Sequence, residues 1–153
     1  MKKIASFTIN HDTLNKGLYI SRVDGDVITY DVRMKKPNAR DYLKNAGLHT
    51  LEHLLATYMR NTKYSDQIIY VGPMGFRTGF YILLRDTVSA EQAIKLIQDS
   101  FDFAAQFEGN IPGGTRKECG NYLDHDLNDA KAIARDMVHV LKNWTKEQLV
   151  YPK

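Results

Sequence analysis

The segment from Leu18 to Met34 constrains the fold most, because apolar residues alternate along it on both sides of Asp24-Gly25. Successive side chains of a strand point to opposite faces, so a period of two indicates a half-buried strand. Asp-Gly between two such runs is typical of a hairpin turn, where glycine takes a positive φ readily. The segment therefore predicts an antiparallel hairpin. The residues expected to face the core from its second strand are Ile28, Tyr30, Val32 and Met34.

Arg33 falls on the opposite face of that second strand, together with Val27, Thr29 and Asp31. Two interpretations of Arg33 remain open from the pattern alone. It is either a solvated cation on a half-exposed sheet or a clamp for an anion or a hydroxyl group.

The remaining elements predict an α+β fold with a mostly antiparallel sheet and helices packed on one face. Apolar spacing indicates helices over 48–61, from a Ser89 cap to about residue 107, and from an Asp126 cap onward. Short strands are expected at 67–71 and 80–84, a long irregular loop at 108–123, and a short helix from Thr145. No repeat or boundary divides the chain, so residues 1–153 are expected to form a single domain.

Composition narrows the classes of function. The 153 residues are 43% hydrophobic and 25% charged, which is typical of globular proteins, and no apolar run reaches the length of a membrane span. The net charge of +3 is mild and basic pairs are scattered, which disfavours nucleic acid as a partner. Cys119 is the only cysteine, so no intrachain disulfide can form. Together with the lack of an export signal, this predicts a cytoplasmic protein.

The clearest chemical motif is His49-Thr50-Leu51-Glu52-His53. Helix positions four apart lie on one face, so His49 and His53 are placed to bind a single metal ion. Glu52 lies at the edge of that face, where a carboxylate can take a proton from a group bound to the metal. The spacing H-x-x-E-H also occurs in one class of metallopeptidases.

Cys119 is a candidate third ligand, because it lies among charged and glycine residues in the expected loop rather than in an apolar run. Two imidazoles and a thiolate leave a fourth tetrahedral position for water or substrate, which is the pattern of a catalytic site. The same donors suit Zn, Fe(II) or Co(II). A cysteine as third ligand does not belong to the metallopeptidase pattern, which disfavours that function.

With these residues in place, the chain resembles the S-ribosylhomocysteine lyases, the LuxS proteins that make the autoinducer precursor of quorum sensing. The resemblance runs nearly end to end. It rests on Ser6-Phe7 with His11, Asp31-Val32-Arg33 with Pro37-Asn38, the block from His49 to Leu55, Pro73-Met74-Gly75 with Thr78-Gly79-Phe80-Tyr81, and Cys119-Gly120 with His125-Asp126-Leu127.

The resemblance implies a homodimer with active sites at its interface and one divalent metal ion per chain, held by His49, His53 and Cys119. The family metal is Fe(II), often replaced by zinc or cobalt. Ser6, His11 and Arg33 would lie near the substrate. The family reaction moves the ribose carbonyl along the sugar by enolisation and then eliminates homocysteine. Glu52 matches one acid/base of that reaction.

Two positions depart from the family pattern. The second acid/base of the family is a cysteine in the sequence Pro-Met-Gly-Cys, and Phe76 stands in its place here. Tyr70 stands where family members often carry an aspartate near the homocysteine portion of the substrate. Three hypotheses follow. The chain is a lyase of this type with low turnover, a metal-dependent isomerase or epimerase acting on another sugar or ribosyl thioether, or a catalytically silent relative that binds a ligand.

Overall fold

The computed structural model describes all 153 residues and has the expected α+β architecture. Its strands are β1 (Gly17–Asp24), β2 (Val27–Arg33), β3 (Ile68–Pro73) and β4 (Gly79–Arg85), and its α-helices are α1 (Asn45–Met59), α2 (Ala90–Gln106) and α3 (Leu127–Val140). Three short 3₁₀ helices complete the list: η1 (Ala5–Phe7), η2 (Ser65–Gln67) and η3 (Lys146–Leu149). No helix is both long and apolar enough to cross a membrane.

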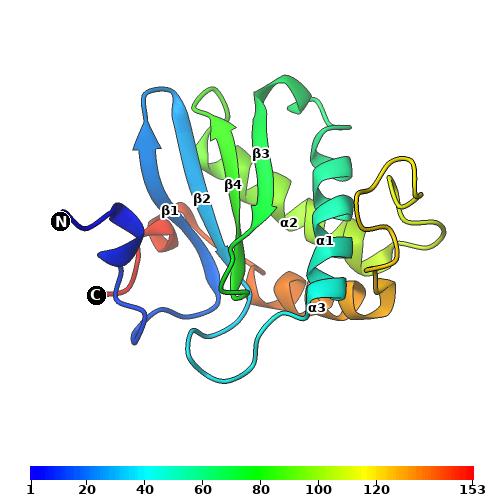
Figure 1. Cartoon of the computed structure of the whole chain (residues 1–153). Coiled ribbons are helices and arrows are strands. Elements are labelled where there is room, and N and C mark those ends of the chain that lie inside the picture. Colours follow the sequence, from blue (N-terminus) through cyan, green and yellow to red (C-terminus); the bar gives the residue numbers. More distant parts are fainter.

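The four strands form one antiparallel sheet in the order β1-β2-β4-β3 (Figure 1). The predicted hairpin is β1–β2, and Gly25 takes a φ of +60° in its turn. The core-facing set expected for β2 is confirmed at Tyr30, Val32 and Met34, which are buried in the core, and Ile28 packs against it. The opposite face of β2 is not exposed, because Thr29, Asp31 and Arg33 are buried as well. The hairpin therefore supplies one apolar face on which the rest of the chain packs.

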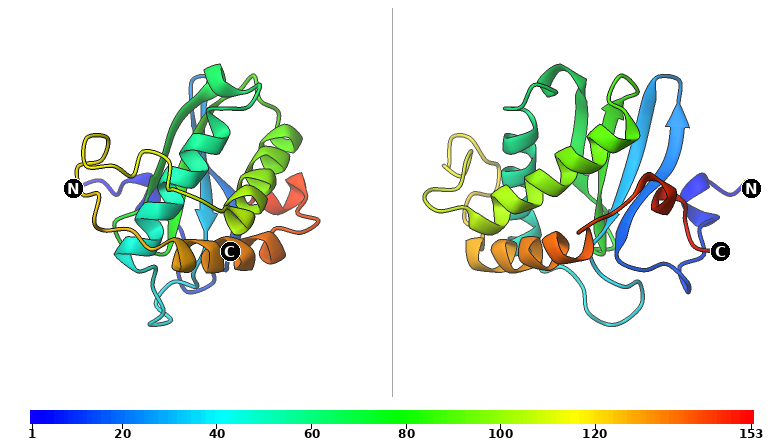
Figure 2. Two further views of the ribbon diagram at one scale, coloured as in Figure 1. Left: turned by 90° about the vertical axis from the view of Figure 1, so that its right-hand side faces the viewer. Right: turned by 180° about the vertical axis from the view of Figure 1, so that it is seen from behind.

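The helices lie on one side of the sheet, as Figure 2 shows from behind: α2 crosses in front of the strands, and α3 packs against α1 and α2. One apolar cluster of 28 buried residues joins that face to the helices. Helix α1 packs into this cluster through Leu51, Leu54 and Leu55, which have no exposed surface. The face of α1 that carries His49 and His53 is left half-buried beside this stripe.

The helix ends follow local capping chemistry where the sequence provides it. Ser89 and Gln92 form the expected capping box of α2, and Asp126 accepts a hydrogen bond from Asp129 N–H at the start of α3. The expected start of α1 at Leu48 was wrong, because the helix begins at Asn45. Lys44 caps it without a side-chain hydrogen bond, so the sequence carries no start signal there.

Candidate functional site

Helix α1 presents His49 and His53 one turn apart, and backbone carbonyls orient both rings. His49 Nδ1 lies 2.7 Å from the Asp124 oxygen, and His53 Nδ1 lies 2.8 Å from the Pro112 oxygen. A carbonyl oxygen only accepts hydrogen bonds, so each Nδ1 carries the proton and donates it. Each Nε2 is then left with a lone pair, which is how a metal-binding histidine is usually oriented.

The two Nε2 atoms face each other at 3.1 Å. Two lone pairs at that separation repel unless a cation lies between them. Cys119 Sγ completes the arrangement at 3.4 Å from His49 Nε2 and 3.9 Å from His53 Nε2. Zinc holds nitrogen at about 2.0–2.1 Å and sulfur at about 2.3 Å, so the donors of a tetrahedral ion lie about 3.3–3.6 Å apart. The three side chains therefore fit a single divalent ion.

His125 also lies in this group, although the sequence does not identify it as a candidate ligand. Its Nε2 lies 3.8 Å from Cys119 Sγ, and its ring stacks on that of His49 with centroids 4.0 Å apart. Burial lowers the pKa of His125, and the neighbouring imidazoles of His49 and His53 lower it further, which favours the neutral form of the ring. In the sequence, the only indication that His125 lies near the other donors is its position six residues after Cys119.

Glu52 is half-buried on α1 next to His53, and its carboxylate has no hydrogen bond or ion pair within the chain. It lies outside the group of metal-binding side chains. A half-buried carboxylate that is not tied to another side chain is free to accept and return a proton.

Four of the five residues expected to contact substrate line one cavity of about 160 Å³. Its walls are Ser6, Phe7, Ile9, His11, Arg33, Phe76 and Tyr81. The Phe76 ring is half-exposed there, with the guanidinium carbon of Arg33 5.2 Å from its centroid and the His11 ring edge-on at 6.4 Å. The fifth residue, Tyr70, does not line this cavity and is 53% exposed on β3.

Arg33 is 1% exposed, so the interpretation as a solvated cation was wrong. Its Nε and one terminal nitrogen donate to the buried Asp31 carboxylate at 3.2 and 2.6 Å, and its other terminal nitrogen donates to Thr78 at 2.9 Å. Tyr151, near the C-terminus, donates to the same carboxylate at 2.6 Å. Burial, then the Asp31 charge, raises the pKa of the Tyr151 phenol, so its hydroxyl keeps the proton that it donates. This network fixes the guanidinium at the cavity wall.

Replacing Asp31 by alanine is expected to destabilise the fold by about 3–5 kcal/mol, the usual cost of leaving one member of a buried ion pair uncompensated. Urea unfolding at a fixed protein concentration measures the change. The matched control is Asp24→Ala, which removes the exposed Arg22–Asp24 pair and should change stability little. Equal midpoints for the two variants would contradict the structural role of the buried pair.

The cavity and the metal-binding group share no residue and come from different parts of the chain. The N-terminal segment of the cavity lies beside β1, whereas the loop between α2 and α3 lies beyond α1, at the other side of the sheet (Figures 1 and 2). The two parts of the expected site are thus not brought together within one chain.

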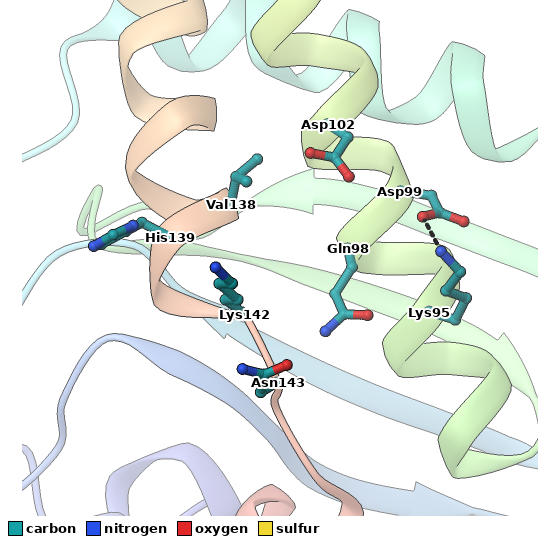
Figure 3. A pocket seen from close by; sticks show the side chains of 8 residues that line it. All are labelled: Lys95, Gln98, Asp99, Asp102, Val138, His139, Lys142 and Asn143. Atoms are coloured by element: carbon teal, nitrogen blue, oxygen red, sulfur yellow. Dashed lines mark hydrogen bonds and ion pairs between the residues drawn. The ribbon is translucent and has the colours of Figure 1, made fainter.

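A groove of about 460 Å³ between α2 and α3 holds none of the expected site residues (Figure 3). Its walls are Lys95, Gln98, Asp99, Asp102, Val138, His139, Lys142 and Asn143. Lys95 and Asp99 pair at 2.8 Å, and two lysines face two aspartates overall. The groove therefore has no single sign of charge to select a ligand.

Known proteins resemble this chain along its whole length. The family model described as S-ribosylhomocysteinase (LuxS) matches residues 4–148. The chain belongs to this family. S-ribosylhomocysteine lyases of Phocaeicola vulgatus and Clostridium beijerinckii are 48% and 47% identical, over 99% of this chain and 98% and 99% of theirs. That of Borrelia garinii subsp. bavariensis is 45% identical over 99% of this chain and 100% of its own.

Membership of the LuxS family makes the chain an enzyme of the carbon–sulfur lyase class. The resemblance to the family has different implications for the metal-binding group and for the cavity. The resemblance implies that the donors on α1 and on the loop facing it correspond to the metal ligands of the family. The cavity contains Ser6, His11, Arg33 and Phe76. The resemblance implies that Phe76 stands at the position of the family cysteine.

Proposed function

We propose that the protein is a metal-dependent S-ribosylhomocysteine lyase with low turnover. The observation that carries the proposal is the convergence of His49, His53 and Cys119 on one point, with both histidine tautomers set by backbone carbonyls. These three side chains would hold one divalent ion per chain, and Fe(II) is favoured over Zn or Co by the family resemblance. A bound ion supplies a Lewis acid that polarises a sugar carbonyl.

Glu52 is the proposed acid/base. Its carboxylate stands one residue before His53 on the same helix and has no partner within the chain. In this role Glu52 takes a proton from one carbon of the sugar and returns it to the neighbouring carbon. The carbonyl group thereby moves one position along the sugar. The same carboxylate then removes the proton that allows homocysteine to leave.

Ser6, His11 and Arg33 are proposed to bind the substrate's polar groups in the cavity of about 160 Å³. The cavity and the metal-binding group lie toward opposite edges of the sheet within one chain. We therefore propose a homodimer in which each chain supplies one part of every active site. Tyr70, exposed on β3, would contact the substrate only at such an interface. Residues 1–153 would act as one domain in the cytoplasm.

Low turnover is proposed because Phe76 takes the place of the second acid/base. A phenyl ring carries no proton, and here it also fills part of the cavity between Arg33 and His11. The same observation favours a second candidate, a metal-dependent isomerase or epimerase of another sugar or ribosyl thioether. That enzyme would need Glu52 and the metal but no elimination step.

Deuterium exchange tests the role of Glu52 in either enzyme. In deuterated water, the Co(II)-loaded protein is expected to introduce deuterium at sugar carbons of S-ribosylhomocysteine, as followed by NMR. Glu52→Gln keeps the shape of the side chain and should slow exchange by about 10²–10⁴-fold with metal content unchanged. Exchange that persists in Glu52→Gln would exclude this carboxylate as the base. No exchange by the unmodified protein, with a panel of ribosyl thioethers and pentoses, would favour a silent relative.

A further inference from the structure

Arg33 faces the cavity with hydrogen-bond donors that its partners within the chain leave unused. A guanidinium carries five N–H groups. Two of those of Arg33 donate to the Asp31 carboxylate and one donates to Thr78, so two remain for a ligand. The side chain is 1% exposed and lines the cavity. Because Asp31 holds the planar guanidinium at two atoms, the direction of the two unused N–H groups depends on how firmly the carboxylate is held.

The Asp31 carboxylate is fully buried and has one donor besides the guanidinium. Tyr151 donates to Oδ2 at 2.6 Å, the same oxygen that accepts a 2.6 Å hydrogen bond from Arg33. Burial, and then the charge of Asp31, raises the pKa of Tyr19 and of Tyr81, so these two phenols also lie near the carboxylate. The Tyr19 hydroxyl donates to a backbone carbonyl instead. Among the three phenols, only Tyr151 donates to Asp31.

The Tyr151 ring is held by the segment that follows α3, which is red in Figure 2 and packs against β1. Trp144 Nε1 donates to the Leu18 carbonyl at 3.0 Å, and Leu149 is buried in the core cluster. The Tyr151 ring stacks on that of Tyr19, with centroids 5.1 Å apart. Packing therefore places the ring independently of its hydroxyl, and the hydroxyl reaches Asp31 from a fixed position.

We propose that Tyr151 is a positioning residue for substrate, which sets the direction of Arg33 through the Asp31 carboxylate. The proposal rests on the proposed role of Arg33 in binding substrate. Tyr151 does not line the cavity, so it acts only through the carboxylate. Without the phenol, the carboxylate keeps the guanidinium as its only side-chain donor, and the two groups are free to turn together. The unused N–H groups then lose their fixed direction toward the substrate.

Calorimetric titration with S-ribosylhomocysteine tests the proposal in the Zn-loaded Glu52→Gln protein, in which turnover is slowed. Tyr151→Phe keeps the ring and its stacking and removes only the hydroxyl. We expect it to weaken binding by about 10–100-fold, because a misplacement of about 1 Å can cost up to about 10²-fold. The matched control is Tyr19→Phe, which removes a hydroxyl from the other ring of the stack. It should bind the substrate like the parent protein.

Hydrogen exchange followed by nitrogen NMR supplies a readout that needs no substrate. The Arg33 Nε–H group is buried and donates to Asp31, so its proton should exchange slowly with water. We expect faster exchange in Tyr151→Phe and an unchanged rate in Tyr19→Phe. Equal exchange rates in the two variants would contradict the proposal, because Arg33 would then be held equally well without the phenol.

A double-mutant cycle separates positioning from a general loss of stability. Arg33→Lys keeps a cation beside Asp31 but loses the planar fork, so it should itself weaken binding. Tyr151→Phe should add no further loss in the Arg33→Lys protein, because no guanidinium is left to orient. Additive losses would overturn the proposal. A loss in Arg33→Lys with none in Tyr151→Phe would overturn it and leave the proposed function intact, whereas no loss in either would overturn both the proposal and the substrate role of Arg33.

Discussion

Replacing Cys119 or His53 by alanine is expected to abolish stoichiometric metal binding. The thiolate is the only negatively charged donor in the group, and His53 shares the 3.1 Å contact that an ion must bridge. His125 does not compensate for either loss, because it brings no charge and its lone pair is not fixed by a carbonyl. Elemental analysis after dialysis against a chelator measures the effect.

The unmodified protein should retain about one ion per chain, as expected for a site with two imidazoles and a thiolate. His139→Ala, which changes a histidine outside the group, should retain the same amount. Because metal binding stabilises the folded state, the unmodified protein should also lose thermal stability when the ion is stripped, and the Cys119 variant should not. A Cys119→Ala protein with a full complement of metal would contradict the assigned site.

Phe76→Cys is expected to raise the rate of homocysteine release by about 10²–10⁴-fold, the usual contribution of a positioned acid or base. The substitution places a thiol in the cavity wall next to Arg33 and His11 and removes a ring that now contacts both. The measurement is thiol release from S-ribosylhomocysteine under steady-state conditions. The metal content should stay the same, because the cavity shares no residue with the metal-binding group.

Phe76→Ala separates the two effects of that substitution. Alanine removes the ring but supplies no proton, so it should leave the rate close to that of the unmodified protein. Equal gains in Phe76→Ala and Phe76→Cys would show that the bulk of the ring limits the reaction. No gain in either variant would favour a cavity reshaped for a different substrate.

Local patterns predicted the parts of the structure that local chemistry determines. The alternation about Asp24-Gly25 predicted the hairpin, and the spacing of His49 and His53 predicted that one helix would place both on one face. Capping residues predicted where α2 and α3 begin. The start of α1 was missed because Lys44 makes no capping hydrogen bond with its side chain.

The contacts that could not be predicted join residues far apart in the sequence. Arg33 is buried because Asp31, Thr78 and Tyr151 surround it, and Tyr151 is 120 residues from Asp31. The position of His125 depends on the path of the irregular loop between α2 and α3, which has no periodicity to read. Local patterns therefore predicted residues of the metal-binding group and of the cavity, but they did not predict the long-range contacts that those residues make.

Homocysteine release by the unmodified, Co(II)-loaded protein tests the central claim most directly. We predict slow but metal-dependent release of thiol from S-ribosylhomocysteine, which stops when the metal is removed and falls by about 10²–10⁴-fold when Glu52 is replaced by glutamine. Deuterium exchange without any release of thiol would contradict it, because the protein would then be an isomerase.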